Sequence, residues 1–380
     1  MLSDDLPTTI RRFPDLEADN LFAVDAADRL ILDEAVPFTA DLAAGELVVI
    51  GDSFGALTIG AVRLLGATGV RVHQDRLLGE WALQDNAEAL EVGEFSHEIL
   101  DADLVASARV ILLRLPRSLD ALDEIAALIA RFAAPDVVVI AGGRLKHMTG
   151  AMNEVLKKHF GRLDVTHARQ KARVLIVREP LPVDADTDAA APTYPQRQFH
   201  ADLGVWIAAH GGVFAGTRID IGTRYLLDFL PEMKADASSA IDLGSGSGLV
   251  SVVLAKARPE LQVIATDQSL AAVMSSVETA DANEVAERIA VVRDVGLGSQ
   301  PDASADLILL NPPFHIESTV YAGEALRLFE DAARVLKPGG ELWTVFNTHL
   351  GYRAALGRLV GPTRQAGRNA KFTVMVSTRE

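Results

Sequence analysis

Short apolar runs alternate with longer amphipathic stretches along most of the chain, and this pattern predicts strands and helices in turn. In the first half, the apolar runs that predict buried strands are 47–50, 70–73, 110–113, 137–141 and 172–177. The stretches with a helical spacing of apolar residues are 21–32, 54–65, 119–132 and about 148–159. Alternating strands and helices of this kind are typical of a doubly wound α/β sheet.

The second half repeats this alternation. Its predicted strands are 240–243, 261–266, 289–292 and 305–310. Its predicted helices are about 224–230, 249–257 and a helix that begins at Leu270. Gln198–Ile207 alternates apolar and polar residues, which predicts an exposed antiparallel hairpin ahead of the second sheet.

The segment Glu179–Pro195 separates the two patterns. It is rich in proline, acidic residues and alanine, a composition that does not favour regular structure. We therefore expect a first domain over 1–180, a linker over 181–197 and a second domain over 198–380.

The two halves also share short motifs in the same order, which indicates an internal duplication. The matching pairs are Ile50–Ala56 with Leu243–Leu249, Gln74-Asp75 with Thr266-Asp267, Leu112–Arg117 with Leu309–Phe314, and Lys171–Val174 with Asn369–Phe372. We expect two tandem Rossmann-like domains.

The first copy lacks the residues that carry chemistry in the second. Val49 stands in the place of Asp242, and Ser53 stands in the place of Gly246. Arg114 takes the place of Asn311. We therefore expect the first domain to be degenerate, with a bulkier turn that keeps a cofactor away from the backbone.

A glycine-rich turn follows the strand 240–243 and leads into the helix 249–257. Glycines let a ligand approach the backbone, and the first turn of a helix offers free N–H groups to an anion. A Gly-x-Gly-x-Gly turn alone is weak evidence, because many sheets contain one. The predicted cofactor residues in and beside this turn are Asp242, Gly244, Ser245, Gly246 and Gly248.

Two carboxylates follow neighbouring strands. Asp267 lies about twenty residues beyond the glycine turn, where an acid can accept hydrogen bonds from ribose hydroxyls. Its alternative role is to cap the helix from Leu270. Asp294 is equally suited to accepting from an adenine amino group and to capping a loop. With Asn311 as a further contact, these residues favour a cofactor that contains adenosine.

Asn311-Pro312-Pro313-Phe314 follows the strand 305–310 and would lie at its carboxyl end, where ligands bind in such sheets. The Asn311 side-chain oxygen and the Pro312 carbonyl are two acceptors, which suit the two hydrogens of a planar amino group. Holding both hydrogens aims the nitrogen lone pair along one axis. Phe314 could stack on the planar substrate. The alternative is a strand terminator with a buried Phe.

Composition limits the remaining choices. The 380 residues are 49% hydrophobic and contain no cysteine, so disulfides and thiolate metal sites are excluded. No apolar run approaches the length of a membrane span, and the histidines have no ligand spacing. We expect a cytoplasmic protein without membrane or metal partners.

The net charge of −16 argues against a nucleic-acid partner, yet two segments, 144–178 and 350–380, are rich in Lys and Arg. Solvated surface is the simpler interpretation of such segments. The candidate RNA-binding residues are Arg144, Lys146, Lys157, Lys158, Lys171, Arg173, Arg353, Arg364, Arg368 and Lys371.

The motif 242–248, Asp267 and Asn311–Phe314 resemble those of class I S-adenosylmethionine-dependent methyltransferases that modify exocyclic or amide nitrogens. The chain is further similar to the bacterial ribosomal RNA guanine-N2 methyltransferases. The motifs that extend the resemblance are Gly212–Phe214, Ile219–Gly222, Asn347–Tyr352, Asn369–Phe372, Arg12–Pro14, Asp25–Asp28 and Phe54–Leu57. Those in the first domain favour the large-subunit (23S) enzyme over its small-subunit relative.

The resemblance implies a degenerate first methyltransferase domain that binds RNA and a catalytic second domain. It makes Asp242, Gly244, Gly246 and Asp267 cofactor residues and Asn311–Phe314 the guanine N2 site. The target base would be unpaired or flipped out to reach Asn311. Methylation of 16S rRNA, methylation of a protein glutamine amide, and a non-catalytic RNA-binding assembly factor remain as alternatives.

Overall fold

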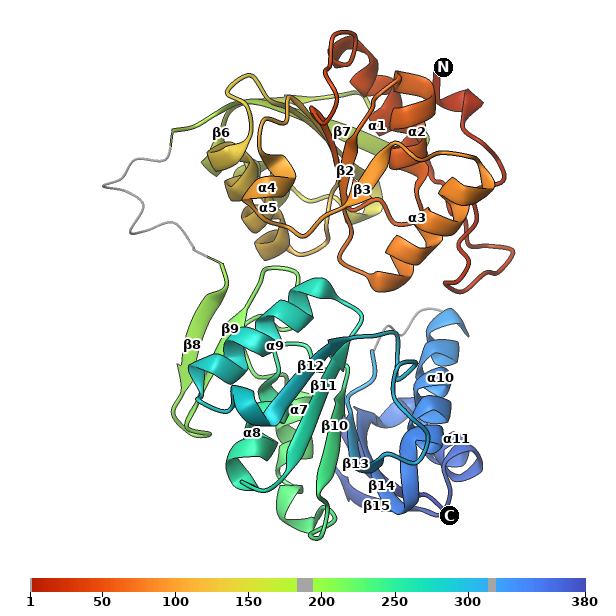
Figure 1. Cartoon of the computed structure of the whole chain (residues 1–380), viewed down its shortest axis with the longest axis vertical. Coiled ribbons are helices and arrows are strands. Elements are labelled where there is room, and N and C mark those ends of the chain that lie inside the picture. Colours follow the sequence, from red (N-terminus) through yellow and green to blue (C-terminus); the bar gives the residue numbers. More distant parts are fainter. Residues whose placement is uncertain (1, 183–193, 314–318) are drawn as a thin grey trace. The chain divides into compact units, whose positions relative to one another are not determined.

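The computed structural model describes residues 2–182, 194–313 and 319–380. The chain divides into two compact units, Met1–Tyr194 and Pro195–Glu380 (Figure 1). In the described parts of the chain, each unit contains one seven-stranded sheet, and the second unit adds a two-stranded hairpin. No helix of the described ranges is long and apolar enough to cross a membrane.

The sheet of the first unit has the strand order β3-β2-β1-β4-β5-β7-β6. Its strands are β1 Leu47–Ile50, β2 Val70–His73, β3 Phe95–His97, β4 Val110–Arg114, β5 Val138–Arg144, β6 Phe160–Val165 and β7 Ala172–Pro180. Its helices are α1 Ala26–Ala35, α2 Ala56–Leu65, α3 Leu77–Ala89, α4 Ala102–Val105, α5 Leu119–Phe132 and α6 Gly150–His159, with short 3-10 turns η1 Leu2–Asp5, η2 Val36–Phe38 and η3 Leu145–His147.

The sheet of the second unit has the same order, β12-β11-β10-β13-β14-β16-β15. Its strands are β10 Ser239–Leu243, β11 Gln262–Asp267, β12 Ile289–Arg293, β13 Ala305–Leu310, β14 Leu336–Asn347, β15 Thr363–Arg368 and β16 Phe372–Thr378, and the hairpin is β8 Gln196–His200 with β9 Val205–Ala209. Its helices are α7 Ile221–Leu227, α8 Leu249–Ala257, α9 Leu270–Ala282, α10 Thr319–Val335 and α11 Arg353–Leu359, with η4 Leu230–Glu232, η5 Ala286–Arg288 and η6 Thr348–Leu350.

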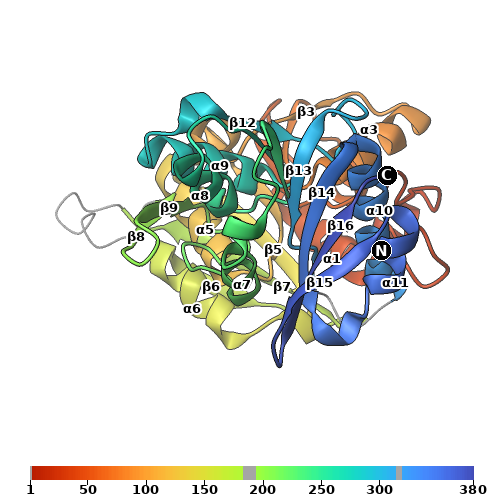
Figure 2. The ribbon, with the colours of Figure 1, turned by 90° about the horizontal axis from the view of Figure 1, so that it is seen from below.

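The identical order of the two sheets confirms the predicted pair of α/β domains. In each sheet the central strands run parallel, and only the next-to-last strand along the edge, β7 or β16, is antiparallel to its neighbours. Helices α8 and α9 cover one face of the second sheet, and α10 and α11 cover the other (Figure 2). Because both faces are covered, the central strands are mostly apolar, and the sequence predicted β10, β11 and β13 but not β14.

The register of the sheets corrects one of the predicted correspondences between the copies. The Gly51 N–H donates to the His73 carbonyl (2.9 Å), and the Gly244 N–H donates to the Thr266 carbonyl (2.8 Å). His73 is therefore the equivalent of Thr266, one residue from the predicted match. Gln74, not Asp75, stands in the place of Asp267, so the first copy has a neutral amide where the second has a carboxylate.

A second correspondence shifts by two residues. The Leu145 N–H donates to the Lys171 carbonyl, and the Thr348 N–H donates to the Lys371 carbonyl, both at 2.9 Å. Each lysine immediately precedes the antiparallel strand of its sheet. Lys171 is therefore the equivalent of Lys371 rather than of Asn369.

Four helices and strands of the first unit have no counterpart in the predicted pattern: α3, α4, β3 and β6. β6 is an edge strand with mostly exposed or half-exposed residues, so it lacks the apolar run of a buried strand. Two strands also extend beyond their predicted ends. β7 continues through Glu179 and Pro180, and β5 continues through Gly142, where a Cβ would lie 2.4 Å from Ile31 of α1.

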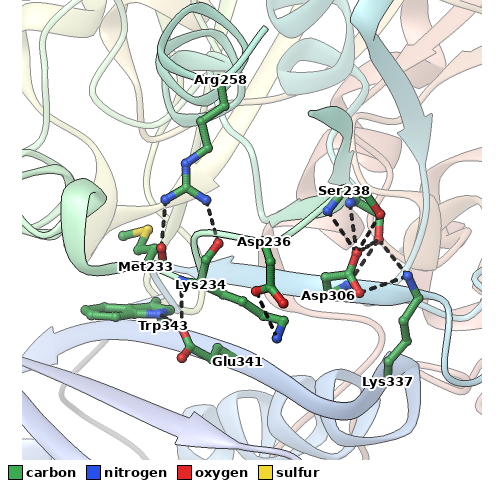
Figure 3. Close-up of polar contacts among 10 residues, drawn as sticks. Met233, Lys234, Asp236, Ser238, Arg258, Asp306, Lys337, Glu341 and Trp343 are labelled. Carbon is green, nitrogen blue, oxygen red and sulfur yellow. Dashed lines mark hydrogen bonds and ion pairs between the residues drawn. The ribbon is translucent and has the colours of Figure 1, made fainter. Parts of the chain in front are cut away.

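Polar contacts join β10, β13 and β14 of the second sheet at the edge where these parallel strands begin (Figure 3). The Asp306 carboxylate in β13 accepts from the Ser238 and Ser239 backbone N–H groups (3.0 and 3.1 Å) and from the Lys337 ammonium (2.9 Å). Although burial opposes ionisation, these hydrogen bonds lower the pKa of Asp306. The strand that leads to Asn311 is therefore anchored at its start.

Candidate active site

A cavity of about 700 Å³ opens at the carboxyl ends of β10, β11 and β13. Chain segments that lie far apart in the sequence meet there, as expected for a doubly wound sheet. The predicted site residues that line it are Asp242, Gly244, Ser245, Gly246, Asp267, Asp294, Asn311, Pro312, Pro313 and Lys371.

The glycine turn provides an open cradle. Gly244 (φ 74°) and Gly246 (φ 55°) have left-handed backbone conformations, and a Cβ at either would meet no atom within 4 Å. Gly248 is different, because it lies outside the cavity lining and caps α8, and its Cβ would be 2.8 Å from Ser276 Cα. Close packing against α9 explains this glycine, where the sequence suggested a ligand contact.

Asp242 stabilises the glycine turn through hydrogen bonds to the helix that follows it. Its carboxylate is buried and accepts hydrogen bonds from the Ser251 N–H (3.0 Å) and hydroxyl (2.8 Å) in the first turn of α8. Burial raises the pKa of Asp242 to about 6, against the opposing effect of the Ser251 hydrogen bonds. The carboxylate thus ties the end of β10 to the start of α8.

Asp267 joins the turn to the next strand. Its Oδ2 accepts from the Gly246 N–H (3.1 Å) and its Oδ1 accepts from the Ser269 N–H (2.9 Å). The N-cap of α9 is Ser269, whose hydroxyl accepts from the Ala272 N–H, so the helix-cap alternative for Asp267 is wrong. The carboxylate faces the cavity and fixes the glycine turn beside it.

Asp294 lines the same cavity and also caps a loop. Its Oδ1 accepts from the Val295 N–H (2.8 Å), and its Oδ2 accepts from the Ser299 N–H (2.8 Å) and hydroxyl (2.7 Å). Both oxygens therefore have partners within the chain, which favours the loop-capping alternative.

Several polar atoms in the cavity wall lack a partner among the described residues. They include Thr266 Oγ1 and Gln268 Oε1, both buried. A buried polar atom that makes no hydrogen bond is costly, so such atoms indicate a polar ligand. Together with the open glycine turn and the Asp267 carboxylate, they fit the hydroxyl and amino groups of S-adenosylmethionine.

Asn311 directly follows β13, and only the nitrogen of its side-chain amide has hydrogen-bond partners among the described residues. Its Nδ2 donates to Asp220 Oδ2 (3.1 Å) and to Thr223 Oγ1 (2.9 Å). Its Oδ1 is buried in the cavity wall and has no partner among the described residues. Pro312 is buried, whereas Pro313 is exposed. The prediction for Phe314 falls outside the residues that the structure describes.

Asp220, Thr223 and Phe214 line the cavity, although sequence reasoning gave them no role of their own. Asp220 is the N-cap of α7 and accepts from the Thr223 N–H (3.0 Å). An Asp three residues ahead of a Thr at a helix start is the signal that could have identified this pair. Phe214 is 64% exposed, so a large aromatic surface faces solvent beside the cavity.

The first unit has the same arrangement with different chemistry. Asp25 caps α1, Asp28 follows three residues later, and Arg114 ends β4. The Arg114 guanidinium donates to both Asp25 oxygens (2.6 and 2.9 Å) and to Asp28. Burial and the neighbouring Asp25 carboxylate raise the pKa of Asp28 to about 6, against the effect of Arg114. In the first unit, the ion pairs of Arg114 with Asp25 and Asp28 thus stand in the place of the Asn311 amide, whose oxygen has no partner among the described residues.

In the first unit, side chains pack in and around the turn that follows β1, the equivalent of the glycine turn. Asp52 accepts from the Leu57 and Thr58 N–H groups of α2 (3.1 and 2.7 Å), the function that Asp242 serves in the second unit. The Arg12 guanidinium lies over the Phe54 ring, 4.4 Å from its centroid. These contacts explain why the first copy keeps the fold without an open cofactor turn.

The structure separates the basic residues that the sequence grouped. Those at the carboxyl edge of the first sheet are Arg144, Lys146, Lys171 and Arg173. Lys157 and Lys158 end α6 at the opposite edge, beside the start of β6. Burial and the positive charges nearby, led by Arg117 and Lys146, lower the pKa of His147 at the carboxyl edge.

In the second unit, Lys371 lines the cavity and lies in the turn between β15 and β16. Arg368 is the last residue of β15, just before that turn. Arg353 begins α11, which follows the end of β14. Arg364 lies further down β15, where its guanidinium packs over Trp343, 5.6 Å from the ring centroid. Arg364 thus has a partner within the core and is not part of the cavity wall.

The strand order, the glycine turn and the acid at the end of β11 define a class I S-adenosylmethionine-dependent methyltransferase fold. Residues 204–376 match the family "Methyltransferase small domain", and residues 2–181 match "RLMG N-terminal domain". The protein is therefore a methyltransferase, and S-adenosylmethionine is its cofactor.

Proteins named "Ribosomal RNA large subunit methyltransferase G" from two Streptomyces species are similar to the chain throughout. The one from Streptomyces avermitilis is 33% identical, covering 98% of this chain and 97% of that protein. The one from Streptomyces coelicolor is 34% identical, covering 98% of each. The chain belongs to the family of ribosomal RNA large subunit methyltransferase G.

A solved structure agrees with the fold. The T. thermophilus 16S rRNA N2 G1207 methyltransferase (RsmC), in complex with AdoMet and guanosine, superimposes with a TM-score of 0.72. It covers 94% of this chain and 92% of that one at 18% sequence identity. At that identity, the likeness shows that both chains share the two-unit fold.

Proposed function

We propose that this protein transfers a methyl group from S-adenosylmethionine to the exocyclic N2 amine of a guanine in 23S rRNA. The observation that carries the proposal is the Asn311 amide in the cavity wall, whose N–H groups are both engaged and whose buried oxygen has no partner among the described residues. Such an amide can only accept at that side, as an amine substrate requires.

The glycine turn and Asp267 would hold the cofactor, which supplies an electrophilic methyl group when bound. Asn311 Oδ1 and the Pro312 carbonyl would each accept one N2 hydrogen of guanine and aim the nitrogen lone pair. Phe314 would stack on the base, and Pro313 would shape the turn between them. Once the N–C bond has formed, the surplus N2 proton leaves to water, so no general base is required.

We further propose a division of labour along the chain. Residues 1–180 would form a non-catalytic RNA-binding domain, 181–197 a linker and 198–380 the catalytic domain. Basic residues at the carboxyl edge of each sheet would contact RNA phosphates. Since the substrate would be ribosomal RNA, the site of action would be the bacterial cytoplasm.

The test is methyl transfer from labelled S-adenosylmethionine to protein-free 23S rRNA, 16S rRNA, assembled ribosomal subunits and a glutamine-containing peptide. We expect N2-methylguanosine in 23S rRNA or in the large subunit. The Asn311→Ala variant should still bind the cofactor through the glycine turn and Asp267, although it loses one predicted contact, and it should lose the label because the amine is no longer oriented.

Each alternative predicts a different pattern of label. Label in 16S rRNA alone would identify the small-subunit activity, and label in the peptide alone would identify a protein-amide methyltransferase. Cofactor binding without label in any substrate would indicate a non-catalytic RNA-binding factor.

A further inference from the structure

An Asn side chain can present either of its two ends to a substrate. The oxygen end accepts hydrogen bonds, and the NH₂ end donates them. Guanine N2 carries two hydrogens, so only the oxygen end of Asn311 can hold it. A rotation of the amide by about 180° would place two donors against each other and would prevent binding of the amine.

Asp220 and Thr223 fix the choice between these ends. Each offers an oxygen to one N–H of Asn311 Nδ2, at 3.1 and 2.9 Å. An ionised carboxylate has no hydrogen to donate, so the Asn311 oxygen gains nothing by turning toward Asp220. The end of Asn311 that has no partner among the described residues is therefore the acceptor.

These two partners are themselves held in place. Asp220 caps α7 by accepting from the Thr223 N–H (3.0 Å). Between them, a Cβ on Gly222 would lie 3.1 Å from the Phe372 ring of β16, so the helix start is pressed against the sheet. Both acceptors thus belong to one rigid turn that lies against the strands beside β13.

In the first unit, the residue at the strand end and one of its two partners at the helix start both differ from those of the second unit. Asp25 and Asp28 hold the positions of Asp220 and Thr223, and Arg114 holds the position of Asn311. Where the strand-end donor carries a full positive charge, the second acceptor is a carboxylate instead of a hydroxyl. The helix cap and the strand end therefore match each other in both units.

We propose that Asp220 and Thr223 are positioning residues for methyl transfer, which lock the Asn311 amide with its oxygen toward the substrate amine. The inference rests on the proposed function, because it assigns no new substrate. It predicts that loss of either acceptor lowers the rate of the chemical step, whereas cofactor binding and RNA binding are preserved.

The test measures kcat, KM for RNA and the dissociation constant for S-adenosylmethionine in four variants. Thr223→Val removes one acceptor, and kcat should fall about tenfold, the effect of one hydrogen bond. Thr223→Ser keeps the hydroxyl, and kcat should recover to within about twofold of wild type. Both constants that describe binding should stay within about twofold in each variant.

Asp220→Asn tests the orientation more strictly. Asn is an equally good helix cap, so α7 should persist. Its new NH₂ group can donate to Asn311 Oδ1 and favour the reversed amide, so kcat should fall further than in Thr223→Val, by about a hundredfold. Arg224→Ala, on the same helix and paired with Asp202, is the control and should leave kcat unchanged.

Three results would overturn the proposal. They are wild-type kcat in Thr223→Val or Asp220→Asn, an equal loss in Thr223→Ser, and a loss of cofactor binding that accompanies the loss of rate. If the wild-type protein itself transfers no methyl group to RNA, the proposed function fails instead.

Discussion

Asn311 and Arg114 end equivalent strands in the two sheets, yet one side chain leaves an acceptor open and the other closes an ion-pair network. The sequence predicted this exchange, because both residues follow a recognisable apolar strand. It did not predict the partners on α1 and α7, since a hydrogen bond across about ninety residues has no local sequence signal. Only the fold brings the helix cap Asp220 beside Asn311 at the strand end.

At the residue scale, Asp242 gives the second unit a pH-dependent stability. Its pKa is about 6 in the fold and 3.8 in the unfolded chain, so the native state binds the proton more tightly. Its contribution to the free energy of unfolding should therefore be greatest below about pH 4 and fall by about 3 kcal/mol as the pH rises to about 6 and above.

The Asp242→Asn variant removes this titration and keeps an acceptor for Ser251. Urea unfolding of both proteins between pH 4 and pH 7 should show the wild type losing stability relative to the variant as the pH rises. A Trp81→Phe background would leave the remaining tryptophans, Trp206 and Trp343, to report on the second unit. A difference that does not change with pH would contradict this assignment.

At the element scale, the predicted bounds are most accurate where an apolar pattern ends abruptly at a loop, although the largely buried strand β14 was not predicted. β13, α5 and α8 have the predicted bounds, because their apolar pattern ends where a loop begins. The edge strand β6 was missed, since partial exposure leaves no apolar run. Gly248 was assigned to the ligand because a glycine pattern does not say which face of the turn each glycine serves.

The glycine turn provides a matched pair of substitutions. Gly248→Ala combines a left-handed backbone with a contact of 2.8 Å to Ser276 Cα, so it should lower the free energy of unfolding by about 3 kcal/mol. Gly246→Ala has the same backbone strain but open space, so the loss should be about 1 kcal/mol. Chemical denaturation of both variants measures the difference, and equal losses would show that the packing argument is wrong.

At the scale of the whole molecule, the two sheets have the same strand order. The edge of the first sheet that corresponds to the cavity edge of the second, where the parallel strands end, is therefore a candidate RNA-binding surface. Lys146→Glu/Lys171→Glu reverses two charges at the carboxyl edge, and RNA affinity should fall about tenfold with a shallower salt dependence. Lys157→Glu/Lys158→Glu makes the same change in net charge at the opposite edge and should have little effect. Equal losses in a binding assay at several salt concentrations would reject the edge as the contact.

Only the second of the two copies should hold the cofactor. Calorimetric titration of the full chain with S-adenosylmethionine tests it most directly, with Gly246→Ala and the equivalent first-unit change Ser53→Gly alongside. One cofactor should bind per chain, more weakly after Gly246→Ala and equally well after Ser53→Gly. Two cofactors per chain, or an affinity that responds to Ser53→Gly but not to Gly246→Ala, would contradict it.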